Sequence, residues 1–433
     1  MKKSIKAIAA ASAALAMAFS CVPVTYAAED VPAVQTEAEP EAKKTGVTFE
    51  ESDPVEVPYK GNICLIADDG TVYYEGADTD ARCVYYFSLD ENGNMDKSYK
   101  CSGYTNDKGE YIGIMNSRLK QCGEYFYLIY SEAYGFSMRE TVIIKLDSEL
   151  NEVAKYRAPK THNLDTNGEK IVYMKPGNRT IYSTDMDGKN KQVLYTLGQD
   201  NELNELGTLN FIVVQGDYVG FQGLSGDSLS PKNEKYYCGI IDLKTGEVTL
   251  KEQRSVQQLY ESNGKIIWYS SESRDMRDSY RIDVPEGEDP NTYCVEYTKK
   301  YTEYFKDGEF YVLDDGEYSV IKTQSQREFF GMTIDDDGNV ITYIADGKGN
   351  TVFKIYRDNK LLDTYTVSVK GFSRFVANNG VITFCYSGRG PQPGDWVSFD
   401  PNMSYEEYEE FMASMPKIEY TMKSATINYS VNE

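Results

Sequence analysis

Carboxylates are the groups in this sequence that could carry out a reaction. The chain of 433 residues contains 68 Asp and Glu residues. Two carboxyl groups about 5 to 10 Å apart can cleave a glycosidic bond when one is desolvated and keeps its proton. With so many acids, a pair is informative only if both members line the central cavity of a fold and one is buried.

Histidine chemistry rests on one residue, because His162 is the only imidazole in the chain. A Ser-His-Asp triad, or a zinc centre with several His ligands, would have to be built around this single side chain. We therefore assign no catalytic residue and no cofactor, and we expect His162 to lie in a solvated loop.

Two acidic turns resemble the Asp box of sialidases, at Ser88–Gly93 and Ser183–Gly188. In both, the Gly comes one residue late and the trailing Trp is missing, and the box is in any case an element of fold. We expect Asp90 and Asp185 to accept hydrogen bonds from backbone amides of β-turns.

Calcium binding would need oxygen ligands close together, as at 185–190 and 335–339. Neither stretch has the twelve-residue spacing or the terminal Glu of a calcium loop. We assign no metal site; adventitious Ca²⁺ binding is the alternative.

Cysteine usage gives no metal or redox motif. Eight cysteines occur. Apart from Cys21 they are Cys64, Cys83, Cys101, Cys122, Cys238, Cys294 and Cys385. An odd set of seven cannot pair completely within the chain, and no C-x-x-C is present. Several lie in strand-like runs, where Cys acts as a small hydrophobic residue. Disulfides between Cys101 and Cys122, or between Cys64 and Cys83, are the open alternative.

The first 27 residues have the pattern of a secretory signal peptide. Lys2, Lys3 and Lys6 precede an apolar run from 7 to 19, and small residues stand before Ala28. We predict cleavage near Ala28 and release from the cell. A lipid anchor at Cys21 on the cell surface is the alternative, although Leu is missing three residues before this Cys. No later stretch is long and apolar enough for a transmembrane helix.

The charge of the chain restricts its partners. The net charge is −23, and removal of three Lys with residues 1–27 leaves −23 − 3 = −26. Nucleic acids and anionic lipids require a basic surface, so we exclude them as partners. Residues 28–57 are rich in Ala, Glu, Pro and Val, and we predict a disordered acidic linker there.

A repeat governs the rest of the chain, from 58 to 433. Strand-like runs end in Asp at Asp90, Asp147, Asp185, Asp242, Asp283 and Asp400. A second marker, a turn Gly before a strand-like run, occurs at Gly61, Gly123, Gly168, Gly216, Gly264, Gly308, Gly338 and Gly380. Most intervals are 42 to 48 residues, with exceptions of 62 and 30. This period is typical of four short strands per unit, so we predict an all-β propeller with seven or eight four-stranded blades.

Each unit places an inner strand before the Gly marker, for example over 209–213, 299–305, 331–334 and 372–376. Helix is expected only over 404–413, where Ser404 and Glu407 form a capping box. Two strand-like segments over 417–430 are predicted to pair with the first blade and close the ring together with N-terminal residues.

One repeat resembles a known family. Residues 167–173, followed by Ile181–Gly188, are similar to a repeat of the TolB-like and YWTD-like β-propellers found in secreted proteins of Gram-positive bacteria. The resemblance implies a propeller over about 340 residues, counted from the repeat period. It implies little about function, because such propellers bind many partners.

Two functions are compatible with this architecture. The first is a non-enzymatic propeller that binds a protein, peptide or glycan outside the cell through one face of the ring, with Tyr-rich stretches such as 293–304 as contact surfaces. The second is a hydrolase or lyase that acts on glycans with a carboxylate pair in the central cavity. We favour the binding protein, because catalytic side chains are scarce.

Overall fold

The computed structural model describes residues 47–431 with gaps. The gaps are 79, 136, 162, 176, 178, 200–201, 204–206, 226–234, 254–257, 271–307, 324–331, 347–349, 390–406, 408–409, 412–413 and 415–419. The predicted signal peptide over 1–27, Cys21, His162, Cys294 and the Tyr-rich stretch 293–304 therefore lie outside the described residues.

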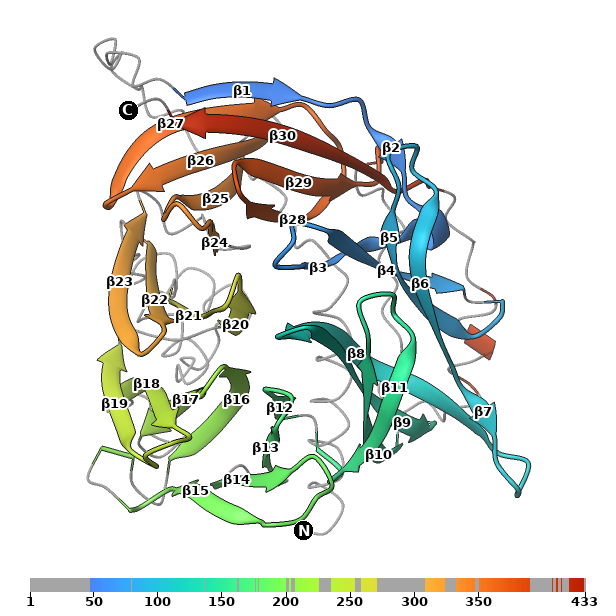
Figure 1. Cartoon of the computed structure of the whole chain (residues 1–433), viewed down its shortest axis with the longest axis vertical. Helices are drawn as coiled ribbons and strands as arrows, with labels where there is room; N and C mark the ends of the chain where they lie inside the picture. The colour runs from blue at the N-terminus through green and yellow to red at the C-terminus, as the bar shows by residue number, and fades with distance from the viewer. Residues whose placement is uncertain are drawn as a thin grey trace, which may run out of the picture. The chain divides into compact units, whose positions relative to one another are not determined.

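The described part of the chain is an all-β propeller with seven sheets, which we number as blades in chain order (Figure 1). Successive strands pair with their neighbours, because short turns join antiparallel strands directly. The chain divides into two compact units, one of residues 1–155, 333–356 and 362–433, the other of residues 156–332 and 357–361.

The first unit holds blades 1 and 7 and most of blades 2 and 6. Blade 1 consists of β3 (Asn62–Ile66), β4 (Val72–Asp78), β5 (Cys83–Leu89) and β6 (Met95–Ser102). Blade 2 consists of β7 (Tyr104–Thr105), β8 (Tyr111–Cys122), β9 (Tyr125–Tyr134), β10 (Ser137–Leu146) and β11 (Glu152–Ala158). Blade 6 consists of β24 (Met332–Ile334), β25 (Val340–Ala345), β26 (Thr351–Arg357) and β27 (Lys360–Val367). Blade 7 consists of β28 (Phe372–Asn378), β29 (Val381–Tyr386), β30 (Lys423–Val431) and β1 (Val47–Glu51), and β2 (Val55–Glu56) also pairs with β30. A short 3₁₀ turn, η1 (Pro58–Lys60), leads into blade 1.

The second unit holds blades 3, 4 and 5. Blade 3 consists of β12 (Leu164–Thr166), β13 (Lys170–Met174), β14 (Thr180–Asp185) and β15 (Gln192–Thr196). Blade 4 consists of β16 (Thr208–Gln215), β17 (Tyr218–Ser225), β18 (Lys235–Asp242) and β19 (Val248–Gln253). Blade 5 consists of β20 (Gln258–Ser262), β21 (Lys265–Ser270), β22 (Gly308–Asp314) and β23 (Glu317–Thr323).

The count of eight Gly markers exceeds the number of blades by one. Gly308 opens β22, the third strand of blade 5, and β22 pairs with β21. Residues 271–307 separate these two strands in the sequence, and the resulting interval matches a repeat by coincidence. The described part of the chain therefore has seven blades, the lower of the two predicted numbers.

The predicted linker over 28–57 extends too far. Its last residues form β1 and β2, and β1 pairs with β30 from Val47↔Val431 to Glu51↔Ile427. Val47 and Phe49 pack against the buried core of blades 6 and 7, and the Phe49 ring stacks on Tyr365 with centroids 4.8 Å apart. The alternating apolar residues of this segment therefore have a partner surface, which makes an ordered strand favourable.

Ring closure uses the two ends of the chain, as predicted, but in the last blade. β30 lies between β29 and β1 in blade 7 (Figure 1), so the C-terminal strand does not pair with the first blade. Of the predicted segment 417–422, the described residues 420–422 are not in a strand. The predicted helix over 404–413 falls mostly outside the described residues; Glu407, Glu410 and Phe411 are helical there.

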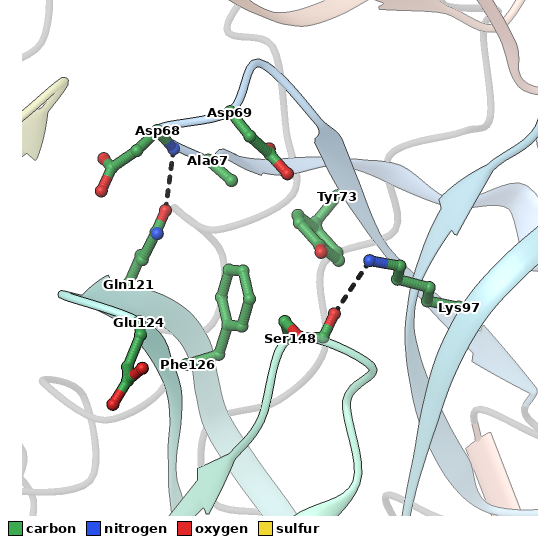
Figure 2. Close-up of a pocket in the computed structure, with 9 residues that line it drawn as sticks. All are labelled: Ala67, Asp68, Asp69, Tyr73, Lys97, Gln121, Glu124, Phe126 and Ser148. Carbon is green, nitrogen blue, oxygen red and sulfur yellow. Dashed lines mark hydrogen bonds between the residues drawn. The ribbon is translucent and has the colours of Figure 1, made fainter.

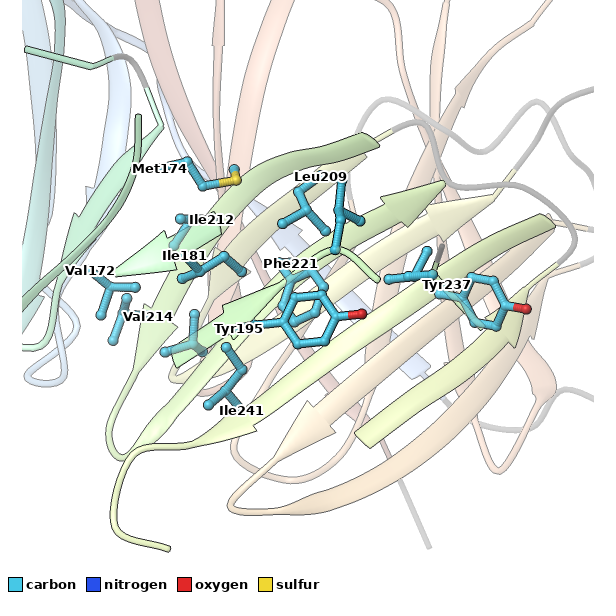
Figure 3. Packing of buried hydrophobic residues seen from close by; sticks show 13 residues of the cluster. Val172, Met174, Ile181, Tyr195, Leu209, Ile212, Val214, Phe221, Tyr237 and Ile241 are labelled. Atoms are coloured by element: carbon cyan, nitrogen blue, oxygen red, sulfur yellow. The ribbon is translucent and has the colours of Figure 1, made fainter. Parts of the chain in front are cut away.

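Within each unit, buried aliphatic and aromatic side chains fill the space between neighbouring blades. In the second unit, Val172, Ile181 and Tyr195 of blade 3 belong to one cluster with Phe221 and Ile241 of blade 4 (Figure 3). Such burial stabilises the fold by about 25 cal/mol for each Å² of apolar surface removed from water. Packing between sheets therefore supplies stability that a single β-hairpin lacks.

Candidate functional site

The acidic turns that could have carried chemistry are structural. Asp90 Oδ1 accepts hydrogen bonds from the backbone N–H groups of Asn92 and Asn94, at 2.9 and 2.8 Å. These bonds favour the ionised carboxylate and lower the pKa of Asp90. The predicted turn role is confirmed for Asp90. In the second turn, Asp185 accepts a hydrogen bond from the side-chain amide of Asn190 at 2.8 Å.

The same turn recurs where an Asp is followed four residues later by an Asn. In each copy the Asn backbone N–H donates to Oδ1 of the Asp, and the Asn side chain donates to the same carboxylate. We call this arrangement the Asp–Asn clamp. Its copies are Asp90–Asn94, Asp147–Asn151, Asp335–Asn339 and Asp346–Asn350.

One of the two calcium candidates, residues 335–339, contains an Asp–Asn clamp. Asp335 is 1 % exposed, and its carboxylate accepts from Asn339 and from the Tyr429 hydroxyl. Its oxygens therefore serve the protein rather than a cation. Among the described residues, no three His, Cys, Asp or Glu side chains gather as metal ligands.

The six cysteines within the described residues are free thiols, so neither disulfide alternative is formed in the structure. Burial raises the pKa of Cys101 to about 12 and that of Cys385 to about 12. Because the thiolate is the reactive form, these two side chains act as buried apolar groups rather than nucleophiles.

A pocket of about 210 Å³ lies between blades 1 and 2, within the first unit (Figure 2). Its wall comes from the turns between β3 and β4, between β8 and β9 and between β10 and β11, with single side chains from β4, β6, β8 and β9. The lining residues are Ala67, Asp68, Asp69, Tyr73, Lys97, Gln121, Glu124, Phe126 and Ser148.

Aromatic side chains form the inner wall of this pocket. Tyr73 and Phe126 are both buried, and their ring centroids lie 4.9 Å apart in a tilted arrangement. Gln121 joins the blades across the pocket, because the backbone N–H of Asp68 donates to its Oε1 at 2.9 Å. The inner wall is thus apolar and held by contacts from both blades.

Charged groups surround this wall, with three carboxylates, Asp68, Asp69 and Glu124, against one ammonium group. Hydrogen bonds from Thr71 lower the pKa of Asp69, so Asp69 is ionised at neutral pH. Lys97 forms an ion pair with Glu149 at 3.1 Å, and its ammonium group donates to the Ser148 carbonyl at 3.0 Å. The positive charge of Lys97 is therefore already balanced within the protein.

A second group of polar residues joins the same two blades. The Ser117 hydroxyl of β8 donates to Oε1 of Glu75 on β4 at 2.9 Å, and Tyr86 of β5 is directly opposite Glu75 in the sheet register. Burial raises the pKa of Glu75. Glu75 does not line the pocket, so the pocket does not combine this acid with the ionised Asp69 as a glycosidase pair would require.

Sequence reasoning missed both groups of residues. Asp68-Asp69-Gly70 carries the same Asp and Gly turn signal as the repeats. The blade 2 side chains opposite it, from Gln121 to Ser148, come from positions about 50 to 80 residues later in the sequence. The approach of blade 2 to blade 1 brings them together.

Comparisons with known proteins assign the chain to no family. No protein-family model matches the sequence, and no curated protein matches it. The structure is similar to the Neurospora crassa Pan2 WD40 domain, with a TM-score of 0.42, 9% identity, and coverage of 78% of this chain and 91% of that one. Porphyromonas gingivalis dipeptidyl peptidase 4 gives a TM-score of 0.41 at 8% identity, over 78% of this chain and 53% of that one.

Pyrococcus horikoshii acylaminoacyl peptidase gives a TM-score of 0.38 at 15% identity, over 64% of this chain and 43% of that one. The chain thus spans about half the length of the peptidase chains that it matches. The class defined here is a seven-bladed β-propeller. Within the described residues, no helix has the length and apolar character needed to cross a membrane.

Proposed function

We propose that this protein is a secreted, non-enzymatic propeller that binds a peptide or protein by taking a basic side chain into the pocket between blades 1 and 2. The observation that carries the proposal is the composition of that pocket, an aromatic inner wall surrounded by three carboxylates. Secretion rests on the signal-peptide pattern of residues 1–27.

The pocket has the chemistry that a Lys or Arg side chain requires. The aliphatic stem of such a side chain can contact Tyr73 and Phe126, and its charge can reach Asp68, Asp69 or Glu124. A cation near an aromatic face gains about 0.5 to 2 kcal/mol when it is desolvated. The volume of about 210 Å³ exceeds the roughly 30 Å³ share of one water, so a side chain can be accommodated.

The experiment is a calorimetric titration of the whole chain with a short synthetic peptide that contains one central Arg, and with the same peptide carrying neutral citrulline instead. We expect the Arg peptide to bind and the citrulline peptide to bind at least about tenfold more weakly, since each 1.4 kcal/mol corresponds to a factor of ten. Added salt should weaken the binding of the Arg peptide, because salt screens the attraction between exposed charges.

Two matched triple variants distinguish binding in the pocket from attraction of the peptide to the overall negative charge of the chain. In D68N/D69N/E124Q the pocket loses three charges, whereas in E91Q/D107N/D187N three exposed acids elsewhere lose theirs. Only the first variant should lose affinity for the Arg peptide. Equal losses in both variants would mean that net charge alone attracts the peptide, and the pocket would not be the site.

The glycan-cleaving alternative is tested on the same protein by measuring the release of reducing ends from polysaccharides. Turnover that disappears in E75Q would overturn the non-enzymatic assignment, because Glu75 is the acid whose burial favours a retained proton.

A further inference from the structure

Lys97 contributes a positive charge to the wall of the pocket between blades 1 and 2. It lies on β6 at the point where the register of β5 and β6 shifts, and its backbone N–H donates to the Ser88 hydroxyl at 3.3 Å. Its side chain reaches the turn between β10 and β11 of blade 2. There the ammonium group donates to the Ser148 carbonyl at 3.0 Å and pairs with Glu149 at 3.1 Å.

The two ends of the pocket carry opposite charges (Figure 2). One end has the carboxylates of Asp68 and Glu124, and the other end has the ammonium group of Lys97 beside Ser148. The aromatic wall lies between the two ends in this view. A basic side chain that enters the pocket therefore approaches carboxylates at one end and a like charge at the other.

The charge of Lys97 acts on groups inside the pocket. Hydrogen bonds from Thr71 lower the pKa of Asp69, and the Lys97 ammonium group lowers it further. Burial raises the pKa of the Tyr73 hydroxyl, and the same ammonium group opposes that rise. The hydrogen bond with Glu149 raises the pKa of Lys97 itself, so this side chain stays charged at neutral pH.

Glu149 balances the net charge of Lys97 from outside the pocket. Glu149 is not a lining residue, and its side chain is 63 % exposed, against 23 % for Lys97. Water and salt screen an exposed charge more than a partly buried one. A cation inside the pocket therefore experiences the ammonium group of Lys97 more strongly than the carboxylate of Glu149.

We infer that Lys97 is a specificity-determining residue of the pocket. Its ammonium group repels a basic side chain from one end and confines the charge of that side chain to the end formed by Asp68 and Glu124. Glu149 is a positioning residue, because it holds the ammonium group on the turn between β10 and β11 and away from Asp69. The inference rests on the proposed function, since it concerns the same pocket.

The test is calorimetric titration of the Lys97→Met variant with the Arg peptide and the citrulline peptide. We expect Lys97→Met to bind the Arg peptide about two- to fivefold more tightly than the unaltered chain does, the range for one pair of partly exposed charges. Binding of the neutral citrulline peptide should not change, although a general effect on folding or apolar contact would alter both peptides. Lys97→Arg keeps the charge and should keep the affinity of the unaltered chain. Lys97→Gln is the second neutral variant, and melting temperatures show that each variant is folded.

Lys235→Met is the matched control. Lys235 in blade 4 pairs with Glu252 at 2.7 Å and does not line the pocket, so this variant loses the same charge and the same kind of ion pair. Its affinity for the Arg peptide should equal that of the unaltered chain.

A double-mutant cycle tests the role of Glu149. Glu149→Gln should weaken the Arg peptide's binding to the unaltered chain, because the released ammonium group then competes for Asp69. The same change should have little effect in Lys97→Met. Equal effects in both backgrounds would contradict the positioning role.

The outcomes separate this inference from the proposed function. If the unaltered chain binds the Arg peptide and Lys97→Met binds it no more tightly than Lys235→Met does, the role of Lys97 is wrong and the proposed function stands. If only the neutral Lys97 variants bind, the role of Lys97 is supported and the proposed function of the unaltered chain is wrong. If no variant binds at millimolar peptide, both are wrong.

Discussion

At the scale of residues, Asp serves mainly to build turns. Asp90 follows β5, Asp147 follows β10, and Asp242 is the last residue of β18. Each accepts hydrogen bonds from two backbone N–H groups of the turn that follows. A side-chain acceptor inside a hairpin lets the chain reverse without leaving those donors unpaired. The abundance of Asp thus reflects the number of hairpins as well as solubility.

The Asp side chains in these turns should make the stability of the protein depend on pH. Backbone hydrogen bonds lower the pKa of Asp90, Asp147 and Asp242 in the folded protein. Because the folded pKa lies below the unfolded one, the stabilisation is present above the unfolded pKa of about 3.9 and is lost as pH falls through the folded pKa. We expect D90N/D147N/D242N to show a smaller fall in melting temperature between about pH 7 and about pH 2 than the unaltered chain.

The exposed-acid variant E91Q/D107N/D187N serves as the control for this experiment, because it removes the same number of charges. If both triple variants respond to acid alike, general charge repulsion rather than turn hydrogen bonding explains the acid sensitivity.

At the scale of elements, neighbouring strands fit by pairing large with small side chains. In blade 4, Phe221 of β17 is directly opposite Gly239 of β18, and a Cβ atom at Gly239 would overlap the Phe221 ring. The ring also belongs to the core shared with blade 3 and lies 5.3 Å from Tyr195 between centroids (Figure 3). Gly239 therefore provides the space that the Phe221 ring occupies.

We expect Gly239→Ala to lower the free energy of unfolding by about 1 to 3 kcal/mol, because the added methyl group overpacks a core whose rings cannot move freely. Urea denaturation measures this change. Gly113→Ala in β8 is the matched control, since a Cβ there would meet its nearest neighbour at an ordinary 3.6 Å. Similar stabilities for the two variants would contradict the packing explanation.

At the scale of the whole molecule, the two ends of the chain complete one sheet. β1 forms the edge of blade 7 beside β30, so blade 7 contains strands from both termini (Figure 1). The segment that precedes β1 includes the predicted signal peptide. Its removal would leave β1 intact, because cleavage near Ala28 lies 19 residues before Val47.

Export is the prediction at this scale. We expect mass spectrometry of the protein produced by its native cells to give an N-terminus at or near Ala28, with the protein in the medium. A diacylglyceryl group on Cys21 would instead establish the cell-surface alternative, and an intact residue 1 on cell-associated protein would contradict both.

Local sequence patterns determined the strands and turns. The Asp that ends a strand and the Gly with positive φ, as at Gly188 and Gly264, act through backbone geometry within a few residues. The all-β class and the role of Asp90 could therefore be predicted. The Asp–Asn clamp is equally local, and its spacing is visible in the sequence.

Only the tertiary structure decided the blade number, the extent of the first ordered strand and both groups of residues between blades 1 and 2. Gly308 has the local pattern of the Gly marker, but β22 pairs with β21 on one side and with β23 on the other, so Gly308 lies inside blade 5. Ser117 and Glu75 are 42 residues apart in sequence and meet through a bulge in β8. Contacts of this kind depend on which blades are neighbours and on their register, and these are set by the packing of whole sheets rather than by the residues adjacent in the chain.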